Sequence, residues 1–389
     1  MTNNQSKIER LIAELCPNGV EFKELNDIAA ITTGKLNANA MVANGKYPFF
    51  TCAEKPFLIN DYAFDTEAIL ISGNGSQVGH INYFKGKFNA YQRTYVLSDF
   101  AEDIHVGFLL HFLRGYLKEY ILKNAKEGSV PYITLPMLHN FKTPVPPLKI
   151  QEKIVDILDK FTQLEAELEA ELEARKKQYE YYRDELLNIR GVEYKTLREI
   201  GTLIRGSGLQ KKDFTETGVG CVHYGQIYTQ YGTFADKTKT FTTPELAKKL
   251  KKAQKGDVLI AGVSENIEDV CKPLGWLGDE ICISGDMFAF QHNQNTKFIT
   301  FLLQTTNFFK HKRKYAQGAK VTRVKADRIL DFKIPIPSMD EQKRIAETLE
   351  KFDILTGDMS IGLPAEIKAR RQQYEYYRGK LLTFNELEK

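Results

Sequence analysis

The chain contains the same order of motifs twice, and this repetition constrains its fold more than any other feature. GVEFKELNDIA at 19–29 returns as GVEYKTLREIG at 191–201. TPVPPLKIQEKIVDILDKF at 143–161 returns as IPIPSMDEQKRIAETLEKF at 334–352. Matches that recur in the same order indicate a duplicated unit of roughly 190 residues. Each copy is predicted to contain a variable block followed by a helical block.

The helical blocks follow proline-rich turns, and each carries one apolar stripe. RKKQYEYYRDELL at 175–187 returns as RRQQYEYYRGKLL at 370–382. Apolar residues recur at steps of three, four and seven, which is typical of one face of a long helix. Two such stripes are most simply buried against each other, and the repeat favours an antiparallel pair. In the second copy alone, a break or bend is predicted at Gly357, Gly362 and Pro364.

A tetrapeptide is repeated inside the first helical block, as LEAELEAELEA at 164–174. Its leucines recur at i, i+4 and i+8, so we expect them to continue the stripe that faces the partner helix. Its glutamates make this stretch acidic, and we expect it to stand away from phosphate.

The first residues of the chain resemble the end of the central helix. SKIERLIAELCPNGVE at 6–21 lies before the first GVE motif as YRDELLNIRGVE lies before the second. An N-terminal helix that meets the C-terminal helix would close a pseudo-two-fold ring. The predicted fold is α+β, with two mixed α/β domains separated by two long, antiparallel, coiled-coil-like helices. The predicted segments are an N-terminal helix, a first domain, a central spacer helix, a second domain and a C-terminal spacer helix, at 1–18, 19–145, 146–190, 191–335 and 336–389.

The variable blocks indicate short strands, loops and some helix. EAILISGNGSQVGHINYF at 67–84 and GDVLIAGVSENIEDVCKP at 256–273 each place an apolar strand before a polar loop, so we predict corresponding units. KKLKKAQK at 248–255 is predicted to be an exposed, solvated helix.

Charge is concentrated in one segment of the chain. The net charge is only +4, but residues 191–335 carry 23 basic and 15 acidic side chains. Such a positive segment suggests an anionic partner, most commonly nucleic acid, although a solvated lysine-rich surface gives the same count. The chain has no apolar run long enough for a membrane span. Its five cysteines lack CxxC spacing, which argues against a zinc site or a disulfide framework and fits the cytoplasm.

PPLKIQEKIVDILDKF, the repeated tetrapeptide and RKKQYEYYRDELL together resemble the specificity subunit of type I restriction-modification enzymes. The resemblance covers essentially the whole chain. It implies a non-catalytic DNA-binding subunit in which each variable block is a target-recognition domain for one half of a split sequence. The helices are then the spacer between the two domains.

The resemblance also implies partners. Two modification subunits dock on such a protein and methylate adenine with S-adenosylmethionine, and restriction subunits add ATP- and Mg-dependent cleavage. No cofactor is expected on this chain, and catalytic and metal-binding residues are both predicted to be absent. In agreement, the sequence has no GxxxxGK[ST] loop, no methyltransferase NPPY-like motif and no HExxH. SGNGSQVG at 72–79 lacks the spacing of a nucleotide-binding loop.

Candidate DNA contacts are Arg or Lys for guanine and phosphate, and Asn or Gln for adenine. In the first block the candidates are Lys35, Asn74, Ser76, Gln77, Gln92 and Arg93. In the second block they are Lys211, Lys212, Ser264, Asn266, Lys314, Lys320, Arg323 and Lys325. The last four belong to HKRKYAQGAKVTRVK at 311–325, which has seven basic side chains. For Arg93 a salt bridge between strands is the alternative, and for the lysines a solvated side chain.

The YEYYR motif occurs in both helices, at 179–183 and 374–378. Tyr181, Arg183, Tyr376 and Arg378 lie off the predicted stripes, so they either face solvent or dock the modification subunits.

Two other classes of protein remain as alternatives. One is a scaffold whose coiled coil holds two modules that do not bind DNA. The other is a stand-alone nuclease or methyltransferase, for which the expected motifs are missing.

Overall fold

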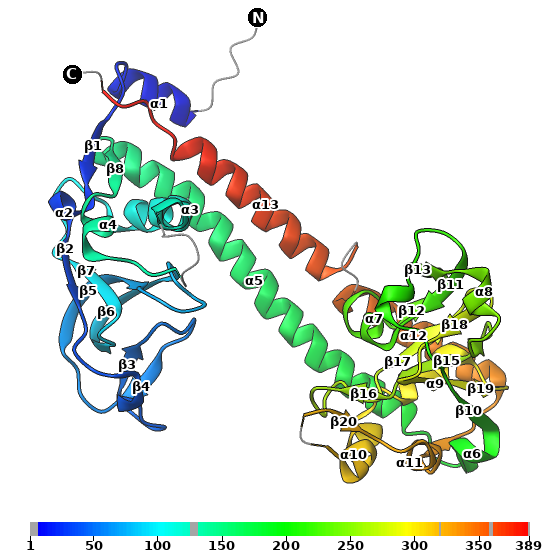
Figure 1. The fold of residues 1–389 in the computed structure, drawn as a ribbon. Helices are drawn as coiled ribbons and strands as arrows, with labels where there is room; N and C mark the ends of the chain where they lie inside the picture. Colours follow the sequence, from blue (N-terminus) through cyan, green and yellow to red (C-terminus); the bar gives the residue numbers. More distant parts are fainter. Residues whose placement is uncertain (1–6, 125–130, 319, 358–360, 388–389) are drawn as a thin grey trace, which may run out of the picture. The chain divides into compact units, whose positions relative to one another are not determined.

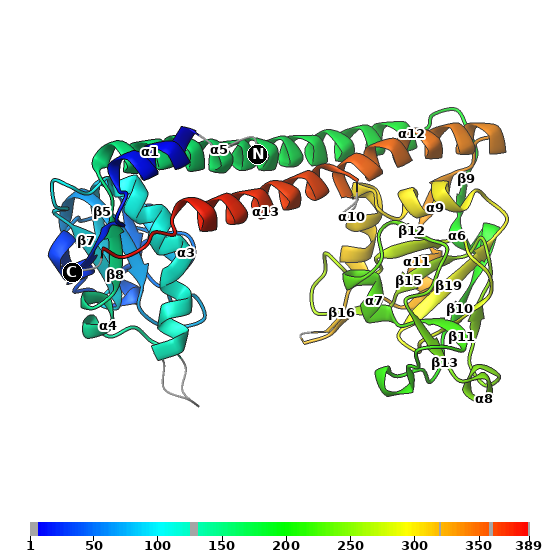
Figure 2. The same ribbon diagram turned by 90° about the horizontal axis from the view of Figure 1, so that it is seen from above.

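The computed structural model describes residues 7–124, 131–318, 320–357 and 361–387 (Figures 1 and 2). The chain forms two compact units. Unit 1 contains Met1–Glu167 and Ala369–Lys389, and unit 2 contains Leu168–Lys368. The long helix α5 (Leu148–Leu187) belongs to both, because it continues without interruption for 40 residues.

Unit 1 is built on a six-stranded sheet covered by helix α3 (Val106–Asn124) (Figure 2). Neighbouring strands are antiparallel except β6 and β3, which are parallel. In spatial order the strands are β2 (Ala30–Thr33), β7 (Thr94–Ser98), β5 (Phe64–Ser72), β6 (Ile81–Ala90), β3 (Tyr47–Phe50) and β4 (Phe57–Ile59).

The main core of unit 1 lies between this sheet, α3 and the first turns of α5. Ile69 and Ile71 of the sheet, Phe108 and Leu117 of α3, and Ile154 of α5 are buried in it. A two-stranded ladder of β1 (Glu21–Glu24) and β8 (Lys142–Val145) lies beside the short helices α2 (Leu25–Ile28) and α4 (Leu135–His139). The ladder therefore joins the beginning of the first variable block to its end.

Unit 2 repeats this topology with a five-stranded sheet. The pair of β17 and β12, which corresponds to β6 and β3 of unit 1, is parallel, while the other neighbours are antiparallel. In spatial order the strands are β10 (Gly201–Arg205), β19 (Met287–His292), β15 (Val258–Ala261), β17 (Pro273–Trp276) and β12 (Phe234–Ala235). The pair of β9 (Tyr194–Thr196) and β21 (Lys333–Pro335) matches β1 and β8. The predicted α+β class and internal repeat are confirmed.

Unit 2 also contains elements of its own. A four-stranded sheet has the order β13 (Thr240–Thr242), β11 (Val219–Val222), β18 (Ile281–Ile283) and β14 (Lys252–Ala253). The place of α3 is taken by α9 (Thr296–Leu302) and α10 (Thr306–Tyr315). Asn295 and Thr305 begin these helices, because their side chains accept hydrogen bonds from the N–H groups of Phe298 and Phe308 at 3.0 and 3.2 Å. Smaller helices are α6 (Leu197–Ile200), α7 (Tyr224–Thr229), α8 (Pro244–Ala247) and α11 (Ala326–Leu330).

The prediction of an exposed helix at 248–255 is wrong. Helix α8 ends at Ala247, and Lys252–Ala253 is strand β14. Ala253 is fully buried, while the Lys252 ammonium pairs with the Glu280 carboxylate. Inward and outward side chains therefore alternate with the two-residue period of a strand, which the run of lysines hides in the sequence.

The predicted break in the second helical block is confirmed. Helix α12 (Met339–Gly357) ends at the predicted glycine, and α13 (Leu363–Leu381) begins next to Pro364. In unit 1, α5 and α13 are antiparallel, because Phe161 stacks on Tyr377 at 5.3 Å and Glu165 pairs with the earlier residue Arg371. In unit 2, Tyr182 of α5 lies over Phe352 of α12 at 6.3 Å.

The leucines of the repeated tetrapeptide are less covered than expected. Leu164 is 44% exposed, and Leu168 and Leu172 are half-buried. The expectation of a buried stripe is therefore wrong at Leu164. A step of four residues turns the side chain by about 40° around an α-helix, so the two steps from Leu164 to Leu172 carry the leucines off one line.

Helix α1 (Lys7–Leu15) packs against the end of α13 within unit 1 (Figure 1). The Lys380 ammonium lies 2.6 Å from the Glu9 carboxylate. Beyond the helices, the Val20 N–H donates to the Asn385 carbonyl, and the Leu387 N–H donates to the Val20 carbonyl, both at 2.9 Å. The predicted contact between the two terminal segments is therefore present, while the division into five segments stays a prediction.

Candidate nucleic-acid interface

All candidate DNA contacts of unit 1 lie on loops at one end of its six-stranded sheet. The loop after β5 carries Asn74, Ser76 and Gln77, and the turn after β6 carries Gln92 and Arg93. The two loops are joined directly, because the Gly73 N–H donates to the Arg93 carbonyl at 2.9 Å. Loops at the end of a rigid sheet are common sites of recognition.

Lys35 is brought to the same place by the chain that follows β2. Gly34 is buried, and a Cβ atom there would lie only 1.8 Å from the Ala90 carbonyl oxygen, so only glycine fits. The Gln92 N–H donates to the Leu36 carbonyl at 2.9 Å. Lys35 itself is exposed.

Two residues near these loops could not be selected from the sequence. The side-chain amide of Gln92 donates to Asn37 Oδ1 at 2.9 Å, so Asn37 joins the candidate set. Cys52 Sγ donates to Asn74 Oδ1 at 3.1 Å. Asn74 is half-buried, and we infer that it shapes its loop. Ser76, Gln77, Gln92 and Arg93 are exposed.

The alternative for Arg93 is not supported. The Arg93 side chain is exposed and makes no salt bridge with any residue of the described ranges. A sequence signal for Asn37 did exist, since it follows the GK turn, but single polar residues are too common in loops for this signal to select one.

In unit 2 the candidate residues gather on two paired segments. Strand β16 (Val263–Ser264) pairs with β20 (Thr322–Arg323), which places Ser264 opposite Thr322. Backbone hydrogen bonds of 2.9 Å in both directions between Gln317 and Arg323 close the turn before β20. This turn presents the exposed side chains of Lys320, Arg323 and Lys325.

Asn266 is exposed but is committed to its own loop. Its side chain donates to Asp269 Oδ2 at 2.9 Å and accepts from the Asp269 N–H at 2.8 Å. Ser264 Oγ accepts from the Asn266 N–H at 3.3 Å. These contacts favour a role for both residues in shaping the loop.

One of the seven basic side chains at 311–325 is structural. Lys312 is 6% exposed, and its ammonium donates to the carbonyls of Glu268 and Val270 at 2.7 and 2.6 Å. Burial lowers the pKa of Lys312. Burial also raises the pKa of the neighbouring Cys271 thiol to about 12. The backbone of Cys271 is in the left-handed region, with a φ of 62°. Lys312 therefore holds the base of the loop, and the exposed Lys314 remains a phosphate candidate.

Two adjoining pockets connect the remaining candidates of unit 2. One, of about 560 Å³, lies between the sheet and the turn that carries Gln317, Arg323 and Lys325. The other, of about 370 Å³, is lined by Gln210 and His223. Arg205, Gly285 and Asp286 line both pockets.

Lys211 and Lys212 begin a short 3-10 helix next to the second pocket, and both are exposed. Burial, together with the charge of Lys211, lowers the pKa of His223. A neutral His223 leaves the positive charge of this region on the lysines and on Arg205. Arg205 was not among the predicted contacts, because it stands at the end of a strand rather than in a basic cluster.

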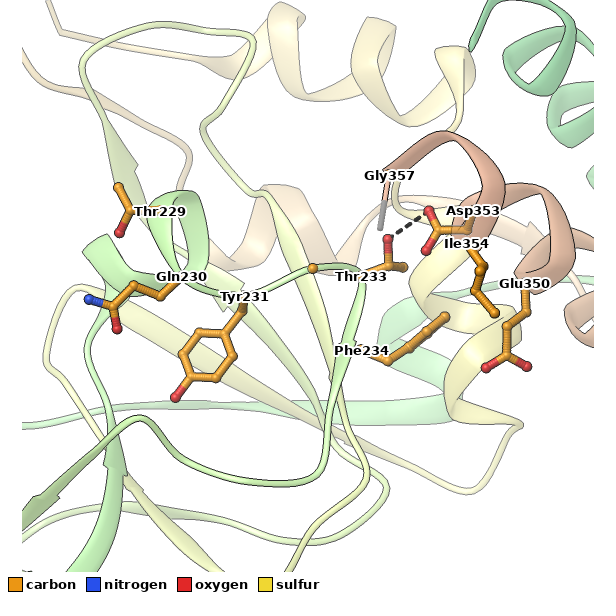
Figure 3. A pocket seen from close by; sticks show the side chains of 10 residues that line it. Thr229, Gln230, Tyr231, Thr233, Phe234, Glu350, Asp353, Ile354 and Gly357 are labelled. Atoms are coloured by element: carbon orange, nitrogen blue, oxygen red, sulfur yellow. Dashed lines mark hydrogen bonds between the residues drawn. The ribbon is translucent and has the colours of Figure 1, made fainter. Parts of the chain in front are cut away.

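A third pocket of unit 2, of about 440 Å³, has a different character (Figure 3). It lies between residues 229–234 and helix α12. The Thr233 hydroxyl donates to Asp353 at 2.9 Å, and the Lys297 ammonium donates to Glu350 at 2.5 Å (Figure 3 shows the first of these contacts). Carboxylates on its wall disfavour phosphate, so this pocket does not belong to the candidate interface.

The YEYYR residues divide into exposed and covered side chains. Tyr181 is 61% exposed and Tyr376 is 66% exposed. The prediction that Arg183 lies on an accessible face is wrong, because it is 8% exposed and lies over the Tyr179 ring at 5.5 Å. Arg378 is half-buried over Tyr374 at 5.2 Å. An arginine four residues after a tyrosine lies on the same helix face, and its long apolar stem packs along the ring.

Neither a metal cluster nor a membrane helix is found in the described parts of the chain. No group of three or more His, Cys, Asp or Glu side chains there is arranged to hold a metal ion. Every described helix is too short or too polar to cross a lipid bilayer.

Comparison with known proteins gives a consistent result. The model of the type I restriction modification DNA specificity domain matches residues 17–174 and 189–369. A Haemophilus influenzae protein named as a putative type I restriction enzyme specificity subunit is 29% identical over 409 residues, which cover 99% of this chain and 100% of that protein. A type I restriction enzyme specificity subunit of Escherichia coli is 35% identical over 279 residues, which cover 70% of this chain and 67% of that protein.

Solved structures show the same fold. The crystal structure of the S subunit of a type I restriction-modification system from M. genitalium matches with a TM-score of 0.55 and 15% identity, over 94% of this chain and 96% of that chain. A chain from a structural study of complex assembly in the type I system matches with a TM-score of 0.60 and 14% identity, over 94% of this chain and 98% of that chain. Since the family model matches the chain twice and covers most of its length, this protein belongs to the type I restriction-modification DNA specificity family.

Proposed function

We propose that this chain is the DNA sequence-specificity subunit of a type I restriction-modification complex and that each unit recognises one half of a split target. The observation that carries the proposal is the repeated sheet, because the equivalent end in each unit bears exposed side chains of the kinds that recognise bases and bind phosphate. Residues 19–145 and 191–335 then act as the recognition domains, and residues 146–190 and 336–389 as the spacer between them. Family membership supports this division.

Like the other specificity subunits of its family, this chain recognises DNA and is not catalytic. Modification subunits that carry S-adenosylmethionine would methylate adenine at the bound site. Restriction subunits would supply ATP- and Mg-dependent cleavage. With these partners, and with its five cysteines all free, the protein is expected in the cytoplasm.

The exposed tyrosines of the two helices support a docking role for the modification subunits. Tyr181 and Tyr376 occupy the same position of the repeated motif, and both leave most of their ring uncovered. Tyrosine is enriched at the centres of protein interfaces, because its ring buries a large area and its hydroxyl still forms hydrogen bonds. Arg378 extends the same stretch, while Arg183 does not, because it is buried.

The direct test is the methylome of cells that express this chain with its modification subunit. We expect methylated adenines in a sequence of two defined halves separated by a gap of fixed length. A contiguous methylated sequence would contradict the two-half assignment. No new methylation, together with no shift of duplex DNA by the complex, would instead favour a scaffold.

The phosphate contacts of unit 2 have a separate test. Replacing Lys320 or Lys325 by Gln should lower affinity for every duplex and reduce the slope of log K against log salt by about 0.9 for each phosphate that is no longer neutralised. Lys248→Gln, which removes an exposed lysine outside both pockets, serves as the control. A change of preferred sequence without a change of slope would mean that the replaced lysine contacts a base.

A further inference from the structure

The equivalent ends of the two sheets can be aligned residue by residue. Gly206 after β10 corresponds to Gly34 after β2, because a Cβ atom at Gly206 would lie 2.0 Å from the Ser284 carbonyl oxygen, the same kind of close crossing. The Gly34 N–H donates to the Thr94 carbonyl at 3.4 Å, and the Gly206 N–H donates to the Met287 carbonyl at 3.0 Å. Both glycines therefore fix the same register.

This register makes the turn Gln92–Arg93 equivalent to Gly285–Asp286. The residue before each crossing glycine is Thr33 in unit 1 and Arg205 in unit 2. Unit 1 thus has its arginine on the turn, whereas unit 2 has its arginine on the adjoining strand end and a carboxylate on the turn. Both sheet ends present one arginine at the crossing, although the sequence positions differ.

Arg205 is held by this turn without being covered. Its Nε–H donates to the Gly285 carbonyl at 3.1 Å, and an η nitrogen lies 3.9 Å from the Asp286 carboxylate. The side chain remains 71% exposed and lines both adjoining pockets. A contact through Nε fixes the plane of a guanidinium group and leaves its η nitrogens for a planar partner.

We propose that Arg205 recognises a guanine in the half-target bound by unit 2, an inference that rests on the proposed function. A guanidinium group forms two parallel hydrogen bonds with O6 and N7 of guanine in the major groove, which is the commonest specific contact of arginine. A phosphate contact is the weaker assignment, because the Asp286 carboxylate would lie beside the phosphate and repel it. Asp286 instead orients the guanidinium group.

The test uses the assembled complex of this chain with its modification subunit. Arg205→Gln should lose preference for guanine at one base pair of the second half-target by roughly 10- to 100-fold and shift that position toward adenine, which glutamine recognises. The first half-target and the gap should stay unchanged. Arg344→Gln is the matched control, since Arg344 is also exposed and paired with a carboxylate, Glu341, but lies on helix α12.

The readout is the methylome, together with competition binding of duplexes that carry each base at each position of the second half-target. If Arg205→Gln weakens binding to all duplexes equally and lowers the salt slope, Arg205 contacts phosphate and the inference is overturned. Unchanged discrimination at every position overturns it as well. If methylation is lost altogether, Arg205→Lys and the competition assay decide on the same criteria.

Failure of the proposed function is distinguishable from failure of the inference. The proposed function fails if the wild-type complex methylates no two-part sequence. The inference fails if the wild type does so and the Arg205 variants keep the same discrimination.

Discussion

At the scale of single residues, two buried glutamines have the same function in the two halves. Gln151 and Gln342 are 0% and 1% exposed, and each donates to the carbonyl of the proline five positions earlier, at 2.7 and 3.0 Å. The side-chain oxygen of Gln151 accepts from the His105 N–H at 2.8 Å, and that of Gln342 accepts from the Asn295 N–H at 3.0 Å. Each glutamine therefore ties the start of a spacer helix to the loop that begins the domain helix.

Gln151→Ala should destabilise unit 1 by about 3 kcal/mol, because it leaves several buried backbone groups without partners. Hydrogen exchange at the His105 amide and urea unfolding measure the effect locally and globally. Gln163→Ala removes an exposed glutamine from the same helix and should cost well under about 1 kcal/mol. If the His105 amide were equally protected from hydrogen exchange in both variants, Gln151 would not have this role.

His292 should make the stability of unit 2 depend on pH. Its Nδ1 accepts from the Gln294 N–H at 3.1 Å, and its Nε2 is buried and has no hydrogen-bond partner among the described residues. Burial lowers the pKa of His292 from 6.5 to about 4. Between these values the unfolded chain binds a proton that the folded chain does not. Stability is therefore complete above pH 6.5 and is lost as the pH falls toward 4, by up to about 3 kcal/mol.

Urea unfolding followed at about pH 7.5 and at about pH 5 measures this loss, and His292→Phe should reduce the difference between the two free energies of unfolding. If the free energy of unfolding of His292→Phe changed with pH as much as that of the wild type, groups other than His292 would cause the pH dependence.

At this scale the sequence could predict which residue types recognise DNA and which stretches carry them. It could not predict which of these side chains are buried. Arg93 and Gln92 could be chosen because base recognition needs their chemistry. Arg183 and Lys312 look like surface residues in sequence, and only the helix faces and carbonyl groups around them show why they are covered. Arg205 was missed because its relation to Gly206 and Asp286 depends on sheet register.

At the scale of elements, α5 and its repeated tetrapeptide offer an adjustable length. The helix is continuous, so removing one unit of four residues shortens it by about 6 Å and turns the following part by about 40°. The half-exposed leucines mean that this stretch depends little on tight packing, which favours tolerance of such a change.

Deleting Leu168–Glu171 should leave both half-targets unchanged and shorten the gap between them by about one or two base pairs, since a base pair rises about 3.4 Å. The methylome of the variant complex measures both quantities. Leu168→Ala keeps the length of the helix and should keep the gap. A changed half-target with an unchanged gap would argue that the repeat does not set the spacing.

The helices and strands were predicted from the sequence better than the residue contacts or the partners. The repeat, the break at Gly357 and the strand–loop units follow from period and turn residues, which are local signals. Lys252–Ala253 was missed because a two-residue strand is decided by its partner β18 and not by its own sequence.

At the scale of the whole molecule, assembly provides the remaining prediction. Tyr181→Ala combined with Tyr376→Ala should weaken binding of the modification subunits at least about 10-fold, because truncating exposed aromatic anchors removes a large buried area from an interface. Co-purification and titration of the modification subunit measure the effect. Tyr83→Ala, which removes a 43% exposed tyrosine from the sheet of unit 1, is the control. Full assembly of the double variant would place the docking surface elsewhere.

The partners of the whole molecule were predictable only through the family resemblance, because no charge count or period identifies a protein partner. The sequence also cannot place an acidic or basic residue beside a particular base, since that depends on which loops meet at a sheet end.

The pairing of Val20 with residues 385–387 has a consequence for how the protein is made. Unit 2 is one continuous stretch, Leu168–Lys368, whereas unit 1 needs Ala369–Lys389 as well as its own first residues. Because the ribosome synthesises the chain from its N-terminus, every part of unit 2 can fold before the last residues of unit 1 are made. The recognition domain that is translated first is therefore finished last, and until then the apolar surface that α13 covers is open to the chaperones of the cell.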